Sequence, residues 1–263
     1  MVSYAFTYDN LLYALLILAR IASFVAVAPL IGGNNTGVSN AVKVAFAVFF
    51  SAMLYGVVPR AALDYDSVFG YSVIVLKEVF CGIALGLAAQ LCMQVTSFAG
   101  HIVDMMSGLS MVTQMDPTSG NQVTITGTIY NQVIMAMLVV SGMYRYLFMA
   151  IADSYAWVPV NGAVFHEQAI VLSMIDFLKN FFIIGFRVAL PVFLVTFTIN
   201  IVLGVLAKVA PQMNMFSVGI QIKILTGMAI LYLSARMLGA AADFILRNMR
   251  ILMEQFIRAM SAI

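Results

Sequence analysis

Charged residues are scarce in this sequence. Only 9% of its 263 residues are Asp, Glu, Lys or Arg, whereas 63% are hydrophobic. A soluble domain carries about 25% charged residues. Most of the exterior of this protein must therefore contact lipid or apolar protein. The net charge of +2 is too small for nucleic-acid binding, which depends on many basic contacts to phosphates. The sequence therefore predicts an integral membrane protein that binds no nucleic acid.

Cysteine, histidine and catalytic motifs are also scarce. Cys81 and Cys92 lie eleven positions apart in one apolar run, about three helical turns and too far to form a disulfide. Two histidines cannot build a His-rich metal site. His166-Glu167 begins like the metalloprotease motif H-E-x-x-H, but Ile170 stands where the second ligand belongs. With no nucleophile elbow and no phosphate loop, we expect no enzyme, no metal and no cofactor.

Long apolar runs dominate what is present. Each has helical length, and the alternation in segments of about ten residues that marks membrane barrels is absent. We expect an all-α integral membrane fold of about six apolar helices, some of them broken. The runs are residues 11–31, 41–58, 68–100, 129–140, 170–206 and 222–242.

Charged side chains interrupt several of these runs. A charge in mid-bilayer costs several kcal/mol unless it is paired or wet. Neighbouring residues point in different directions on a helix, so Lys77 and Glu78 are not expected to pair with each other. Either they reach the headgroups or find partners within the bundle, or they line a wet transport path. The candidate buried charges are Arg20, Lys77, Glu78 and Arg187, with Lys43 and Lys179 at similar positions.

Two shorter features concern packing and orientation. Gly82-x-x-x-Gly86 gives a small-residue face that permits close helix approach. Residues 247–263 carry three arginines against one glutamate. By the positive-inside rule this basic tail is expected to be cytoplasmic.

Residues 101–122 break the apolar pattern. The segment contains four methionines, two glycines and one proline. Methionine is flexible and fills irregular gaps, so it suits a contact that must repack repeatedly, although core packing explains it equally well. His101 and Asp104 are spaced to share a helix face as a structural pair.

Residues 207–219 form a polar turn between two apolar arms. Pro211 cannot continue a hydrogen-bonded helix, and Gln212 and Asn214 put amides in the turn. Lys208 and Lys223 bracket it with positive charge. These residues predict an apolar helical hairpin with a polar tip. Their spacing alone also fits an ordinary connecting loop between membrane helices.

The amino-acid sequence of this turn is more specific than the spacing of its polar residues. Lys208-Val209-Ala210-Pro211-Gln212-Met213-Asn214-x-Phe216, followed by Gly219 and Lys223, resembles the signature of the FliR family. That family provides a subunit of the flagellar type III protein-export gate, with SctT as its injectisome counterpart. The resemblance implies a multi-pass protein of the cell inner membrane and flagellar basal body. It departs from the family at Ser141-Gly142-Met143-Tyr144, where flagellar members often have Gly-His.

The resemblance also implies a division of the chain. Residues 181–246 look like the small FliQ subunit, on the pattern of residues 186–191 and the hairpin tip. Residues 1–180, including the loop 101–122, would be FliP-like, and residues 247–263 the cytoplasmic tail. The implied partners are FliP-like and FliQ-like subunits in a hetero-oligomeric gate, FlhB-like and FlhA-like export components, membrane lipid, and unfolded secreted proteins as cargo. The interrupting charges would then be ion pairs at subunit contacts.

Roles for particular residues follow from the family as well. The loop 101–122 looks like the plug of the central channel, and deleting residues 107–116 should then make the closed complex leak small ions. The implied plug residues are Met105, Met106, Gly108, Met111, Met115, Asp116 and Pro117. The implied subunit contacts at the hairpin tip are Lys208, Pro211, Gln212, Asn214, Phe216, Gly219 and Lys223.

A different class remains open at this point. A secondary transporter with broken helices and midplane charges has similar composition. Such a transporter should be active as a purified monomer or homodimer, whereas a gate subunit should need co-expression with its sister chains. No inverted repeat, which such transporters often carry, is visible in the sequence.

Overall fold

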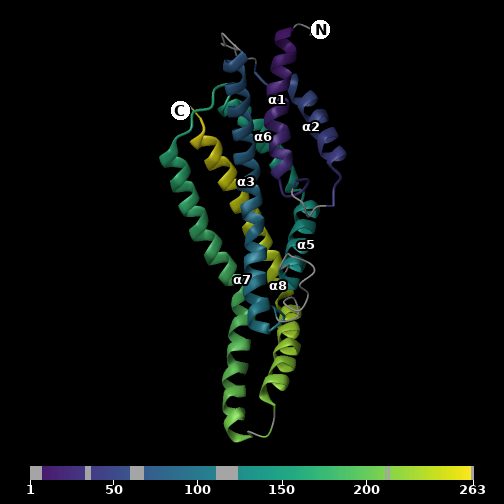
Figure 1. The fold of residues 1–263 in the computed structure, drawn as a ribbon, viewed down its shortest axis with the longest axis vertical. Helices are drawn as coiled ribbons and strands as arrows, with labels where there is room; N and C mark the ends of the chain where they lie inside the picture. Colours follow the sequence, from purple (N-terminus) through teal and green to yellow (C-terminus); the bar gives the residue numbers. More distant parts are fainter. Residues whose placement is uncertain are drawn as a thin grey trace. The chain divides into compact units, whose positions relative to one another are not determined.

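A computed structural model describes residues 8–32, 37–59, 68–110, 124–210, 212 and 214–261. Over these residues the regular structure is entirely helical, which confirms the expected all-α fold (Figure 1). Proline and glycine clusters separate the helices, and Pro191 lies inside one of them without ending it. The helices are α1 (Tyr8–Val27), α2 (Asn40–Tyr55), α3 (Val68–Ser107), α5 (Ile125–Val140), α6 (Tyr144–Trp157), α7 (Glu167–Val209) and α8 (Met215–Ala259).

Among the residues that the structure describes, three helical segments are long and apolar enough to cross a membrane: Asn10–Val27, Val68–Ser107 and Glu167–Val209. The number rises to five if each of two interrupted pairs of segments, α5 with α6 and the two parts of α8, counts as one span. The apolar helix α2 is shorter. The structure therefore agrees with the expected membrane protein containing some broken helices.

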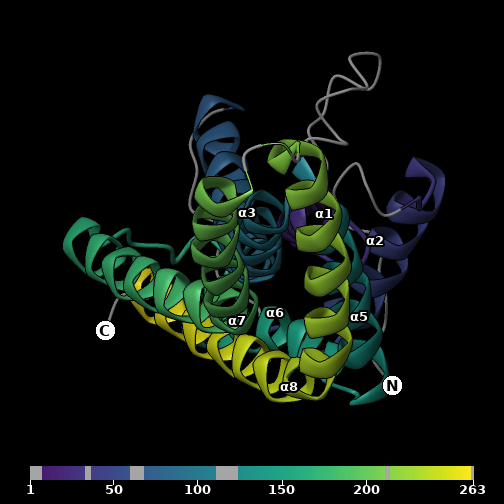
Figure 2. The same cartoon turned by 90° about the horizontal axis from the view of Figure 1, so that it is seen from below.

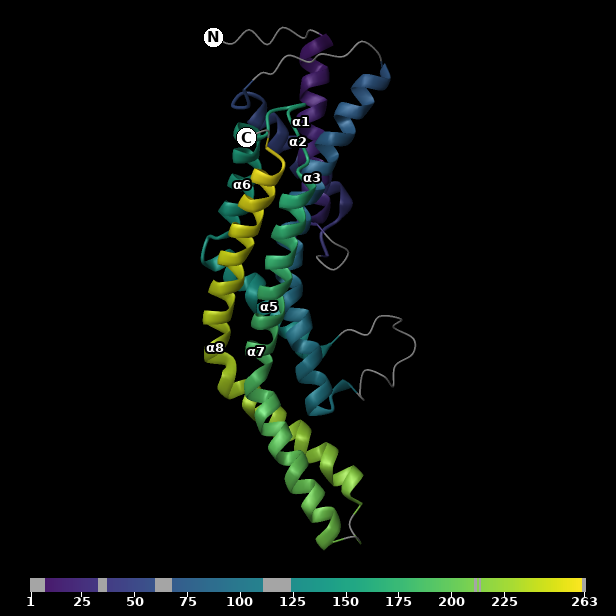
Figure 3. The ribbon, with the colours of Figure 1, turned by 90° about the vertical axis from the view of Figure 1, so that its left-hand side faces the viewer.

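The chain divides into two compact units. Unit 1 contains Met1–Cys92, Gly142–Phe177 and Arg247–Ile263. Within it, α1 lies beside α2 and beside the N-terminal half of α3 (Figures 1 and 3). Its core is built on fully buried side chains of α1, α3 and α6, among them Leu16, Ile21, Leu85 and Ile151. Leu and Ile recur at helical spacing here because only one face of each helix meets its neighbours.

Unit 2 contains Met93–Ser141 and Leu178–Leu246. In it α7 and α8 run antiparallel and form a hairpin, which Figure 2 views from its turn end. Small buried residues, Val103, Ala189 and Val192, form a cluster against which Ile230 and Leu231 pack. Most other large side chains of the hairpin arms remain exposed in the isolated chain. Such a surface is too apolar to face water.

Candidate functional site

The hairpin tip has the local geometry of a capped helix start. Helix α7 ends at Val209, and the backbone N–H of Ala210 still donates to Leu206 O at 2.8 Å. Asn214 precedes α8, and its side-chain Oδ1 accepts the backbone N–H of Ser217 at 3.4 Å. Asn214 therefore acts as the N-cap of α8 and satisfies one of the free donors at the helix start.

The polar side chains of the tip point outward. Lys208, Gln212 and Asn214 are exposed, and Lys223 is half-buried. Gly219 is buried, and a Cβ placed there would lie 3.2 Å from Leu203 Cδ1 on the opposite arm. Glycine at this position thus allows the two arms to approach closely. Pro211 and the side chain of Phe216 lie outside the described residues.

The first part of the predicted loop 101–122 is helical, because α3 continues to Ser107 and carries two of the four methionines. Gly108 has φ +81°, a left-handed conformation that favours glycine and turns the chain out of the helix. Just before it, Met105 is 60% exposed and Met106 is half-buried. The other proposed loop residues, Met111, Met115, Asp116 and Pro117, lie outside the described residues.

Both ends of this loop are tied together by one carboxylate. Asp104 is 2% exposed, and it accepts the backbone N–H of Thr126 at 3.2 Å (Oδ2) and 3.3 Å (Oδ1). The Thr126 hydroxyl also donates to Oδ1. Thr126 is the second residue of α5, so a buried negative charge from α3 caps the positive end of α5. His101 instead contacts Ser97 O through Nδ1 at 2.7 Å, so Asp104 is held by Thr126 and not by the expected His101 pair.

Glycines set the close helix contacts in both units. In unit 1, a Cβ on Gly82 would collide with the carbonyl oxygen of Arg20 and the Ser23 hydroxyl, and a Cβ on Gly86 would lie 2.9 Å from Val27 Cβ. The two glycines thus form the face of α3 that receives α1. In unit 2, a Cβ on Gly100 would collide with the backbone of Gly127 on α5.

A buried ion pair lies at the centre of unit 1. Arg20 Nε and Glu78 Oε2 are 2.6 Å apart, and neither side chain is exposed. Arg20 Nη1 also donates to Ser154 Oγ at 3.2 Å and to Val158 O at 3.0 Å. Its guanidinium carbon lies 4.2 Å from the centroid of the Tyr155 ring. Two of the charges that interrupt apolar runs are therefore paired within the chain.

The remaining interrupting charges have other environments. Lys77 is half-buried, whereas Lys179 and Arg187 are exposed on α7. Sequence spacing alone did not reveal the partners of Glu78 or Asp104. The available signals were opposite charges in the first and the third apolar run, and an aspartate one turn before a loop that ends at a threonine.

These features define a class, a polytopic helical membrane protein with a buried ion pair between two of its helices. No group of three or more His, Cys, Asp or Glu that could hold a metal ion occurs in the described part of the chain. The family described as "Bacterial export proteins, family 1" matches residues 11–249. The chain therefore belongs to this family of bacterial export proteins, the FliR family.

Several curated relatives carry the name flagellar biosynthetic protein FliR. The Bacillus subtilis protein is 28% identical over 214 residues, covering 80% of this chain and 81% of the relative. The protein of Buchnera aphidicola from Acyrthosiphon pisum is 26% identical over 213 residues, 81% of both chains. The Escherichia coli K12 protein is 24% identical over 216 residues, covering 81% of this chain and 80% of that one. These alignments support a part in flagellar biosynthesis and protein transport.

Proposed function

We propose that this chain is a non-enzymatic subunit of the flagellar type III export gate, and that it forms part of the channel through which unfolded proteins cross the inner membrane. Membership of the bacterial export family supports a part in protein export. The single observation that carries the proposal is the hairpin of α7 and α8, whose long apolar arms the rest of the chain leaves largely uncovered.

The lengths of the helices argue that other proteins cover them. Helix α7 has 43 residues, and at 1.5 Å per residue it is about 65 Å long. The hydrocarbon layer is only about 30 Å thick, so much of α7 extends beyond it. In the most apolar part of α7, 17% of the residues are buried, compared with 44% in the corresponding part of α1. Apolar helices of neighbouring subunits would cover the remainder.

Two kinds of sister subunit fit this requirement. In the proposed division, residues 181–246 are FliQ-like and residues 1–180 are FliP-like. One face of the chain then contacts FliP-like neighbours and another contacts FliQ-like neighbours. Heterologous contacts of this kind build closed rings or helical turns. FlhB-like and FlhA-like components are proposed to join from the cytoplasmic side, where residues 247–263 lie.

The polar tip and the methionine loop receive separate roles. Lys208, Gln212, Asn214 and Lys223 are proposed to contact sister subunits, together with Pro211, Phe216 and Gly219. The loop that follows α3 is proposed to close the channel, together with Met105 and Met106 at the end of α3 and Gly108 just after it. The carboxylate of Asp104 supports this role, because it holds the end of α3 and the start of α5, the two helices that flank the loop, together.

Co-expression tests the assembly. The tagged chain is produced alone and together with FliP-like and FliQ-like chains, and the detergent-purified material is analysed for mass and composition. We expect a defined hetero-oligomer from co-expression and aggregated or degraded material from the chain alone. A stable, solute-transporting monomer or homodimer that ignores the sister chains would contradict the proposal and favour a secondary transporter.

A further inference from the structure

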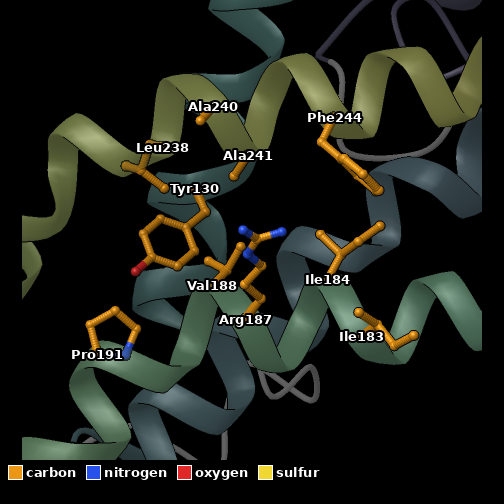
Figure 4. A pocket seen from close by; sticks show the side chains of 10 residues that line it. All are labelled: Tyr130, Ile183, Ile184, Arg187, Val188, Pro191, Leu238, Ala240, Ala241 and Phe244. Atoms are coloured by element: carbon orange, nitrogen blue, oxygen red, sulfur yellow. The ribbon is translucent and has the colours of Figure 1, made fainter.

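A cavity of about 230 Å³ lies in unit 2 between α7, α8 and α5. Its walls are mostly apolar, with Ile184, Val188 and Pro191 from α7 and Leu238 and Phe244 from α8. Tyr130 and Arg187 also line it, and Arg187 is the one charged residue among the lining residues. Figure 4 shows Arg187 projecting from α7 toward α8, on the side where Ala240 and Ala241 leave space. An apolar cleft with few convergent polar groups is the usual form of a small-molecule site.

The positive charge in this cavity has no counterion within the described residues. There Arg187 makes no ion pair and no hydrogen bond. Asp243 on α8 is exposed, is not among the lining residues, and likewise forms no ion pair in the described part of the chain. Arg187 is exposed, so its donors are accessible to an anion from outside the chain. Arginine matches phosphate well, because its planar donors bind two oxygens at once.

The position of Arg187 along α7 agrees with a phosphate partner. Residues 188–207 contain no charged side chain, and they lie between Arg187 and Lys208. Twenty helical residues span about 30 Å, the thickness of the hydrocarbon layer. If this stretch crosses the hydrocarbon, Arg187 lies at its boundary, where lipid phosphates are found.

We propose that the cavity binds one phospholipid with an anionic headgroup. Arg187 contacts the lipid phosphate, and an acyl chain occupies the apolar wall formed by Val188, Leu238 and Phe244. Phe244 and Ile183 are 42% and 55% exposed, so the cavity is open to lipid at its rim. Free phosphate would satisfy the charge but leave the apolar walls unfilled. An acidic helix of another subunit is the competing occupant.

Lipid retention provides the test. The full chain, with any sister subunits that purify with it, is placed in nanodiscs of equal parts phosphatidylcholine and phosphatidylglycerol, then extracted in detergent. Retained lipids are counted by native mass spectrometry. We expect wild type to keep phosphatidylglycerol in preference to phosphatidylcholine, and Arg187→Gln to reduce this preference about five-fold, the effect of one basic side chain at a lipid surface. Ala241→Phe should fill the cavity and lower the retention of both lipids.

Lys179→Gln is the matched control, because Lys179 is exposed on the same helix but is not a lining residue. The proposal would be overturned if Arg187→Gln and Lys179→Gln showed the same preference for phosphatidylglycerol over phosphatidylcholine. The proposal would also be overturned if wild type retained no lipid and Arg187→Gln lost a sister subunit. That result would show that an acidic helix of the sister subunit occupies the cavity. If Ala241→Phe fails to fold, the comparison of Arg187→Gln with Lys179→Gln still decides the outcome, because both residues are exposed.

Discussion

Arg20 on α1 and Glu78 on α3 form an ion pair in which neither side chain is exposed, with 2.6 Å between Nε and Oε2. Glu78 uses its second oxygen to accept the backbone N–H of Asn161 at 3.0 Å. Asn161 has φ 68°, a left-handed conformation that asparagine tolerates better than most residues. The pair therefore fixes the turn after α6 as well as the packing of α1 on α3.

Breaking this pair should be strongly destabilising. Arg20→Met or Glu78→Leu leaves one buried charge without its partner, and we expect each to lower the free energy of unfolding by about 3–5 kcal/mol. The double variant should be less destabilised than the sum, because no unpaired charge remains. Its free energy of unfolding should stay below that of wild type, since Ser154, Val158 and Asn161 each lose one hydrogen bond. The free energy of unfolding of all three variants is measured by denaturant unfolding of the detergent-solubilised protein.

The exposed pair between Arg250 and Glu254 supplies the control. Its Nε and Oε1 are 2.8 Å apart, but both side chains are about half exposed. Arg250→Gln should change the unfolding midpoint little, because solvent screens the interaction. Additive effects of Arg20→Met and Glu78→Leu would show that the two side chains are not coupled.

The class of the fold was readable from sequence because composition decides it. A chain with so few charges has no soluble alternative, and residues 207–219 marked the hairpin turn correctly between α7 and α8. The pairing of Arg20 with Glu78 was not readable, because 58 residues separate them in sequence. Only the contact of α1 with the glycine face of α3 brings them together, and that contact depends on three-dimensional packing.

The glycines of α3 and α7 allow a matched comparison. Gly82→Ala places a methyl group against the Arg20 carbonyl oxygen, so α1 and α3 must separate. We expect a loss of about 1–3 kcal/mol in the free energy of unfolding. Gly204→Ala introduces the same change where no atom lies within 4 Å, so it should stabilise α7 by up to about 1 kcal/mol.

The two glycine variants also report on assembly. Gly204 lies on an arm that we propose is covered by a sister subunit, and Gly82 lies inside unit 1. If Gly204→Ala weakens co-purification with sister subunits while the chain itself stays folded, that arm is a subunit contact. Equal destabilisation of the isolated chain by both substitutions would contradict the packing of α1 on Gly82.

Asp104 and Thr126 should behave as a coupled pair. Asp104→Asn replaces one acceptor oxygen with an amide donor facing the Thr126 N–H, and Thr126→Val removes the hydroxyl donor. Each should lower the free energy of unfolding by about 1–3 kcal/mol, the cost of an unsatisfied buried group. Thr128→Val is the control, because Thr128 is exposed and its hydroxyl donates to the carbonyl oxygen of Thr124, the N-cap residue of the same helix. A double variant as damaging as the two single variants combined would exclude the coupling.

The loop after α3 could be recognised from sequence, but its anchoring could not. Methionines and glycines at residues 105–120 indicated an unusual segment. The carboxylate of Asp104 reaches Thr126 because the backbones of Gly100 and Gly127 come into contact. Neither glycine had a local signature that distinguished it from other glycines in apolar runs.

Deleting the loop tests its proposed closing role. Ser107 packs beneath Gly227, where a Cβ would lie 2.9 Å from Ser107 Cβ, so a deletion that spares Ser107 disturbs the hairpin least. Removing residues 109–116 keeps Asp104, Ser107 and Gly108 in place. We expect cells that express this variant with its sister subunits to leak small ions, measured with a membrane-potential dye. A Gly-Ser segment of equal length should also leak, because it lacks the methionine side chains that fill gaps.

The comparison of these two variants separates chain length from side-chain packing. Leakage from the deletion alone would mean that the backbone blocks the channel and that Met111 and Met115 are not needed. Unchanged conductance in both, in complexes that still assemble, would exclude the loop as the closing element. The seal would then have to come from side chains of α3, α5 or the hairpin, or from a sister subunit, and the methionines would serve only to fill gaps in the core.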